Sequence, residues 1–140
     1  MPLEFYDDGE IGFDELGEPA FAFVVTGENA ETETDVVAFA VRNPEIFGTL
    51  LGQAALCGVA AITNPASFCG GPCPLWRTPL RWLQADCQGA VVLDPGRVYP
   101  VLAAAPGKFV CESWDHADGL VKAGAVPKFK IVIPRLARAA

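Results

Sequence analysis

The sequence predicts an α/β or α+β fold, a single domain over residues 1–140 with a mixed sheet of about five strands, an N-terminal β-hairpin and about four helices. Three observations support this prediction. Two apolar runs rich in β-branched and aromatic residues are typical of buried strands. Farther along the chain, prolines that follow cap-forming residues mark helix starts. Short apolar runs lie between these helices, and strands that alternate with helices favour a sheet with parallel members.

The N-terminal third is expected to contain an acidic arm followed by the hairpin. Residues up to about Glu18 are rich in carboxylates and glycine, so we expect an arm at about residues 1–18 without a regular helix or strand. The runs AFAFVV at 20–25 and VVAFAV at 36–41 are joined by a charged loop. Because neither run alternates with polar residues, we expect two central strands with both faces covered.

Helices are expected where a cap-forming side chain precedes a proline. The proline lacks only an N–H that would be unpaired in the first turn, and the preceding side-chain oxygen can accept from a first-turn amide. The pairs Asn43-Pro44, Thr78-Pro79 and Asp94-Pro95 predict helices over about 44–57, 79–86 and 95–104. A fourth helix is expected over about 113–123, because Ser113 is a good cap and Gly124 can end the helix.

Three short apolar runs are expected to supply the remaining strands. They are GAVVLD from Gly89, KFVCES from Lys108 and FKIVIP from Phe129. In the last of them, apolar residues alternate with Lys128 and Lys130, as in a half-exposed strand.

A longer apolar run, residues 46–62, is 17 residues without a charge. Seventeen residues are the low edge of a membrane-spanning length, and this run contains three glycines and no strongly basic flank. We therefore expect a buried core helix here and no association with a membrane.

The charges are segregated along the chain. The first 41 residues contain eleven acidic residues and no Lys or Arg, whereas residues 42–140 contain six acidic and ten basic ones. The two parts therefore carry net charges of −11 and +4, within a total of −7. Such asymmetry predicts an interaction, either between the acidic arm and the basic remainder of the same fold, which is the commoner case, or with a partner. The candidate binding carboxylates are Asp7, Asp8, Glu10, Asp14, Glu15, Glu28, Glu31, Glu33 and Asp35.

The five cysteines favour a reducing compartment. Their number is odd, and the first residues are acidic where a secretory signal is basic, so we expect a bacterial cytoplasmic protein with mostly buried thiols. Cys69 and Cys73 could bind zinc together with His116, the single histidine. A structural zinc site needs four ligands, and no second close pair is present, so we expect no metal and no cofactor.

Four residues are candidates for acid–base or cation chemistry: Asp94, Asp115, His116 and Asp118. Asp94 follows an apolar run, and the carboxyl ends of strands are where open α/β sheets place ligand chemistry. Asp115, His116 and Asp118 are close enough in a helix to share a divalent cation. Capping explains these residues equally well, because carboxylates stabilise a helix start. We therefore expect no catalytic residues, and keep a small cation-dependent enzyme as the alternative.

A basic-aromatic patch is a further candidate: Trp76, Arg77, Arg81 and Trp82. The two arginines are four residues apart on the predicted helix and could contact phosphate or an acidic partner. A packed helix surface is the commoner meaning of such a group. With Lys128, Lys130 and Arg135, the arginines support a second alternative, a nucleic-acid-binding module with a basic face.

Five stretches carry a resemblance to a family: IGFDELGEPAFAFVV, VAFAVRNPEIFGTLLGQAALCG, NPASF, Gly70-Gly71 and RTPLRWLQADCQGAVVLDP. Together they resemble small uncharacterised proteins encoded by bacterial prophages, plasmids and other mobile elements, which have no established activity. The resemblance covers about residues 11–118, and its most specific part is Arg-Thr-Pro-Leu-x-Trp-Leu from Arg77 to Leu83. It implies a small cytosolic accessory protein of mobile DNA, with no catalytic motif to carry over. Because the pattern of the family does not depend on cysteines, Cys69 and Cys73 become weaker metal candidates.

Together these features predict a non-enzymatic accessory or regulatory protein that binds a host or phage protein through its acidic N-terminal surface. The partner could be a nucleic-acid-binding or defence protein that this binding antagonises. Charge complementarity of this kind speeds association and weakens as salt is added. The sequence leaves the oligomeric state open.

Overall fold

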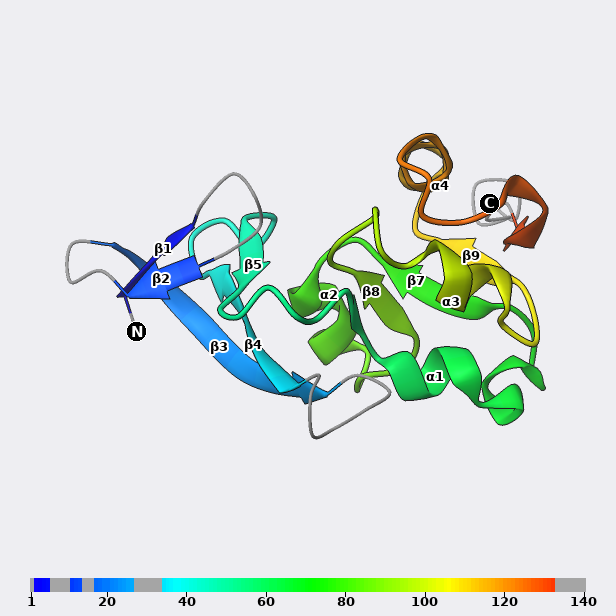
Figure 1. The fold of residues 1–140 in the computed structure, drawn as a ribbon, viewed down its shortest axis with the longest axis horizontal. Coiled ribbons are helices and arrows are strands. Elements are labelled where there is room, and N and C mark those ends of the chain that lie inside the picture. The colour runs from blue at the N-terminus through cyan, green and yellow to red at the C-terminus, as the bar shows by residue number, and fades with distance from the viewer. Residues whose placement is uncertain (1, 6–10, 14–16, 27–33, 133–140) are drawn as a thin grey trace.

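The computed structural model describes residues 2–5, 11–13, 17–26 and 34–132. Two sheets lie side by side, with one helix, α2, at the junction between them (Figure 1). The described residues form four α-helices, a five-stranded antiparallel sheet and a five-stranded mixed sheet, so the predicted mixed α/β class is confirmed. The separation into two sheets is a feature that the sequence pattern did not predict.

The N-terminal sheet has the strand order β2-β1-β3-β4-β5 and is antiparallel throughout. Its strands are β1 (Pro2–Phe5), β2 (Ile11–Phe13), β3 (Glu18–Thr26), β4 (Thr34–Ala40) and β5 (Phe47–Thr49). The predicted hairpin is confirmed as β3 and β4, which pair from Ala20 with Ala40 to Thr26 with Thr34. Both are interior strands of this sheet.

Two expectations for this part of the chain are wrong. The arm contains strands, because Leu3 of β1 is buried against Ala20 and Ala38 and β1 bonds to both β2 and β3. The alternation in these strands is too short to be recognised in the sequence. The hairpin is also not covered on both faces, because Phe21 and Val24 of β3 are 52% and 66% exposed.

The mixed sheet has the order β10-β9-β7-β8-β6. Its strands are β6 (Leu56–Cys57), β7 (Cys73–Trp76), β8 (Ala90–Val92), β9 (Phe109–Cys111) and β10 (Ile131–Val132). The strands β8, β7, β9 and β10 run parallel, while β6 is antiparallel to β8. The first two predicted runs are thus confirmed as β8 and β9. The third forms a strand only at Ile131–Val132, because a 3₁₀ turn, η2 (Lys128–Lys130), precedes it and leaves Phe129 exposed.

The helices cover the two faces of the mixed sheet unequally. They are α1 (Val59–Thr63), α2 (Pro79–Gln84), α3 (Tyr99–Ala103) and α4 (Trp114–Lys122), with a 3₁₀ turn η1 (Pro65–Phe68) after α1. Residues of α1, α3 and α4 pack on one face with Leu75 and Phe109. On the other face, Trp82 of α2 packs with Cys57, Val91 and the N-terminal hairpin. No helix in the described part of the chain is long and apolar enough to cross a membrane.

Two of the predicted helix starts are confirmed. Thr78 Oγ1 accepts a hydrogen bond from the Arg81 amide at the start of α2, and Ser113 Oγ accepts one from the His116 amide at the start of α4. The third helix, α3, begins at Tyr99 and not at Pro95. Asp94 Oδ1 accepts instead from the Gly96 amide, which forms a tight turn before the helix and so delays it.

The helix predicted over 44–57 is wrong. Asn43 and Pro44 lie in a turn in which the Ile46 amide donates to the Asn43 carbonyl, and β5, a loop and β6 follow. Gly52 adopts a positive φ of 66°, which glycine tolerates and which ends regular structure. The nearby backbone amides donate to the carboxylate of Asp35 on β4 and therefore do not need helical partners. The expected core helix of residues 46–62 is therefore replaced by strands and a short α1.

Candidate functional site

The connections of the mixed sheet reverse direction between β7 and β9. β7 continues through α2 to β8 on one side, whereas β9 continues through α4 to β10 on the other side. In open α/β sheets, ligands bind outside the carboxyl ends of strands at such a switch point, because the diverging loops leave a crevice. The first residues after these two strands are Arg77 and Glu112.

Arg77 and Glu112 meet at this point. The backbone amide of Arg77 donates to Glu112 Oε2 at 2.8 Å, and Arg81 Nε lies 3.3 Å from Glu112 Oε1. The Glu112 side chain is only 15% exposed, whereas the Arg81 side chain is 63% exposed. One carboxylate therefore ties the end of β9 to the end of β7 and to the first turn of α2. The ion pair with Arg81 itself is worth little, because water screens so exposed a guanidinium.

His116 completes the cluster. Its Nδ1 accepts from the Glu112 amide at 3.4 Å, so in the neutral ring the hydrogen is on Nε2. Burial lowers the pKa of His116, the Glu112 carboxylate opposes this by raising it, and the Arg77 guanidinium lowers it further. At neutral pH, His116 is therefore an uncharged donor near Arg77. The four residues of this switch-point cluster, Arg77, Arg81, Glu112 and His116, carry a net charge of +1.

The four acid–base candidates do not converge. Asp94 follows β8, as expected, but its Oδ2 binds Arg97 Nε at 2.6 Å. Asp118 pairs with Lys122 at 2.9 Å, and Asp115 lies exposed in the first turn of α4. Within the described residues, which include all four candidates, no group of three or more His, Cys, Asp or Glu could hold a metal ion. The shared cation site required by a cation-dependent enzyme is not formed.

The zinc candidates Cys69, Cys73 and His116 form no such group either, and all three are among the described residues. Cys69 is exposed, and its thiol donates to the Pro65 carbonyl. Cys73 is buried in β7, and burial raises the pKa of its thiol to about 11. Since the thiolate is the metal ligand, a thiol with so high a pKa is a poor one. All five cysteines are free.

The basic-aromatic patch divides between the core and the switch point. Trp82 Nε1 donates to the Gly89 carbonyl at 3.0 Å, and its ring packs 6.0 Å from that of Phe23. Trp76 Nε1 donates to the Gln88 carbonyl at 2.6 Å. The two tryptophans therefore hold the turn before β8. The buried Trp82 fits the commoner expectation of a packed helix surface and does not belong to an exposed patch. Arg77 and Arg81 do lie together, around Glu112.

The other basic candidates do not extend this group into a continuous face. Lys130 Nζ donates to the carbonyls of Ala105 at 2.5 Å and Gly107 at 3.2 Å, which fixes the turn after α3. Lys128 lies beside a shallow pocket at α4. Arg135 lies outside the described residues.

Of the nine candidate binding carboxylates, the structure describes only Asp35. The other eight, Asp7, Asp8, Glu10, Asp14, Glu15, Glu28, Glu31 and Glu33, lie outside the described residues. Asp35 is 1% exposed, so its assignment to a binding surface is wrong. Its carboxylate accepts four backbone hydrogen bonds, from Val36, Leu51, Gln53 and Ala54, at 2.7 to 3.0 Å. Asp35 therefore has a structural role.

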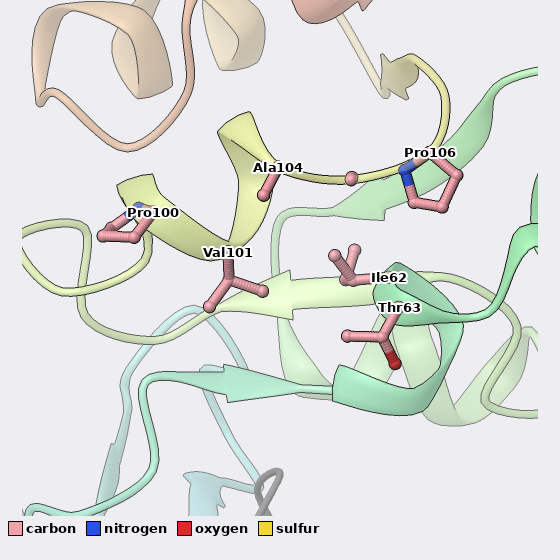
Figure 2. Close-up of a pocket in the computed structure, with 7 residues that line it drawn as sticks. Ile62, Thr63, Pro100, Val101, Ala104 and Pro106 are labelled. Atoms are coloured by element: carbon pink, nitrogen blue, oxygen red, sulfur yellow. The ribbon is translucent and has the colours of Figure 1, made fainter.

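A separate pocket lies between α1 and α3, with a volume of about 350 Å³ (Figure 2). It is lined by Ile62, Thr63, Pro100, Val101, Ala104, Ala105 and Pro106. The Thr63 hydroxyl donates to the Val59 carbonyl. The lining contains no charged side chain, so this pocket offers apolar contact but little to orient a reacting group.

Glu112 was not among the candidate residues, although its spacing of four residues from His116 can be read in the sequence. Its contact with the Arg77 amide spans 35 residues and depends on the sheet order, which local spacing does not show. Comparisons with protein families, with curated proteins and with solved structures found no match. The resemblance to proteins of mobile elements therefore stays an expectation.

Proposed function

We propose that the protein is a non-enzymatic accessory protein that binds a protein partner through its N-terminal sheet. The observation that carries the proposal is an apolar row across three strands. Phe21 pairs with Phe39, and Phe39 pairs with Phe47, so the three side chains share one face of the sheet. The rings of Phe21 and Phe39 stack at 5.6 Å, and yet Phe21 is half exposed.

The same face is covered at its other end. Phe23 and Val25 follow Phe21 on this side of β3 and pack with Trp82 of α2. Val41, just beyond β4, is 56% exposed, and its amide bonds to the Pro19 carbonyl beside Phe21. One half of this face of the N-terminal sheet is therefore apolar and exposed, while α2 covers the other half. Contiguous exposed apolar surface of this kind is typical of protein interaction sites.

The charge of this part of the chain defines the partner. The first 41 residues contain eleven acidic residues and no basic ones, and Glu18 lies exposed in the sheet. A partner with an apolar centre and a basic rim would match. In the mobile-element context, this partner is a bacterial host or phage protein.

The experiment is capture of partners by the tagged full-length chain from a bacterial lysate, at about 0.05 M and about 0.5 M salt. We expect proteins that bind at low salt and are released at high salt, since exposed charges more than a Debye length apart are screened. The double variant Phe21→Asp, Val41→Asp should lose them. The matched control is Phe129→Asp, because Phe129 is equally apolar and more exposed, at 71%, but lies beside the mixed sheet.

A partner found in this way is then purified and titrated with each variant. The proposal is supported if the double variant weakens binding at least about tenfold, which corresponds to about 1.4 kcal/mol, while the control binds like the wild type. Equal binding by the double variant, or capture that salt leaves unchanged, would contradict it. Thermal unfolding of each variant checks that the fold is retained.

A further inference from the structure

We propose that the switch point at the carboxyl ends of β7 and β9 binds the phosphate group of a small molecule, held by Arg77, Arg81 and His116. This inference is independent of the proposed partner surface, which lies on the N-terminal sheet. It combines two observations: the strand connections diverge at this point, and two arginines and the histidine lie around Glu112 there.

The arginines have donors to spare. A guanidinium has five N–H groups in a planar fork that matches phosphate oxygens. Within the described residues, Arg81 bonds to Glu112 through Nε alone, and the bond from Arg77 to Glu112 comes from its backbone amide. The terminal nitrogens of Arg81 and the whole guanidinium of Arg77 therefore make no ion pair among the described residues. Both side chains are largely exposed and can turn toward a ligand.

His116 adds a donor that is held in place. Its ring is fixed by the Glu112 amide on Nδ1, and its own amide donates to Ser113 Oγ at the start of α4. A neutral ring in this tautomer carries its hydrogen on Nε2, and that group can donate to a phosphate oxygen. The donor is rigid, because both bonds are to the loop that follows β9.

Glu112 has a positioning role and also limits the affinity. Its carboxylate joins the loops after β7 and β9, because it accepts from the Arg77 amide and pairs with Arg81. The same carboxylate repels an anion, and it leaves the cluster a net charge of only +1. We therefore expect modest affinity for inorganic phosphate and tighter binding of a phosphate ester whose organic part adds contacts.

His116 provides the measurement, because it is the only histidine and gives one set of ring signals by NMR. The full-length protein is titrated with inorganic phosphate at fixed pH, and sodium chloride of equal ionic strength is the reference. We expect saturable shifts of the His116 ring signals with phosphate and none with chloride. Arg77→Gln and Arg81→Gln should each raise the dissociation constant about tenfold, as expected for loss of a charge-assisted contact.

Arg42→Gln is the matched control, since Arg42 is also an exposed arginine but lies in the turn before β5. It should bind phosphate like the wild type. Arg81→Lys, which keeps the charge and loses the planar fork, should fall between the wild type and Arg81→Gln. Because the Arg81 side chain contacts Glu112, thermal unfolding of each variant is measured in parallel. Arg77→Gln keeps the backbone bond from residue 77 to Glu112, so it tests the proposal without disturbing the position of Glu112.

Three results would overturn the proposal. The shifts could be unsaturable or equal in chloride, which would show ionic strength acting alone. They could saturate but be unaffected by Arg77→Gln and Arg81→Gln, which would place the phosphate elsewhere. Finally, a single-stranded oligonucleotide could bind far more tightly than a mononucleotide, which would make the ligand a nucleic acid and not a small molecule. Tighter binding of the mononucleotide than of inorganic phosphate supports a small phosphate ester.

Discussion

The two sheets of this protein differ in how completely their faces are covered. The mixed sheet has α1, α3 and α4 on one face and α2 with the N-terminal hairpin on the other. The N-terminal sheet has α2 against only part of one face, and Phe21, Val24 and Val41 remain exposed. Parallel strands need crossover connections, which bring helices to the faces, whereas antiparallel strands are joined by short turns that bring none. The difference in coverage thus follows from the difference in strand direction.

The two regions also use their charged residues differently. In the mixed sheet, Arg81, Arg97 and Lys122 pair with carboxylates near the surface. In the N-terminal sheet, the buried Asp35 has backbone amides as its partners. These amides belong to residues 51–54, which connect the sheets, and Arg97 donates to the carbonyls of Gln53 and Ala54 from the other side. The connection is therefore held by one charged side chain from each region.

The largest effect is expected from Asp35→Ala, which tests whether the two regions unfold together. The change leaves buried amides of the connecting segment unpaired, and we expect a loss of about 4 kcal/mol in the free energy of unfolding. Asp35→Asn, whose amide oxygen can still accept some of these bonds, should lose about half as much. Urea denaturation followed by tryptophan fluorescence and by circular dichroism gives both values.

The same experiment tests cooperativity. If the sheets form one unit, the two probes will show coincident transitions in the wild type and in Asp35→Asn. A wild-type loss of β-signal that precedes the fluorescence change would show that the N-terminal sheet opens alone. Asp115→Asn is the control, because Asp115 is exposed, and it should change stability by no more than about 0.5 kcal/mol.

A second prediction compares Phe39, which is buried, with Phe21, its half-exposed neighbour on the same face of the N-terminal sheet. Phe39→Ala should cost about 3 kcal/mol, because this side chain is buried between its neighbours on β3 and β5. Phe21→Ala should cost only about 1 kcal/mol, since half of the Phe21 surface is already in water. Equal losses, measured by urea denaturation, would mean that Phe21 is covered in solution, for example by a second copy of the chain.

Trp82 tests the junction between the two regions. Trp82→Phe keeps an aromatic ring beside Phe23 but removes the indole N–H, so the Gly89 carbonyl loses its partner. We expect a loss of about 1.5 kcal/mol. Trp76→Phe is the matched comparison, because its indole bonds to the Gln88 carbonyl in the same turn but is exposed to water, which can replace the bond. A cost for Trp76→Phe as large as that for Trp82→Phe would contradict the role of Trp82 at the junction.

The smallest effect concerns the pH dependence of stability in the mixed sheet. Burial lowers the pKa of His116 in the folded state, so below about pH 6.5 the unfolded chain binds a proton that the folded protein does not. Stability should therefore fall as the pH decreases from about 6.5 through the folded-state pKa. His116→Gln should remove this part of the pH dependence. NMR titration of the ring gives the pKa directly, and a midpoint above 6.5 would contradict the prediction.

Local chemistry in the sequence was sufficient for part of the fold. Thr78 and Ser113 cap α2 and α4 as expected, because a cap bonds to an amide only three residues away. The β-branched runs formed β3, β4, β8 and β9 because their strand preference is a property of a few adjacent side chains. The uncharged run of residues 46–62 was misassigned because a fully buried segment has the same composition in a helix and in strands.

The tertiary structure decided which of the candidate residues meet. The sequence by itself determined the mixed α/β class, the charge asymmetry and the candidates, since all three follow from composition and local spacing. It could not show that Asp35 is buried against a segment 16 to 19 residues away, or that Glu112 bonds to Arg77 from 35 residues away. These contacts depend on strand order, and strand order is set by the packing of whole elements around a shared core.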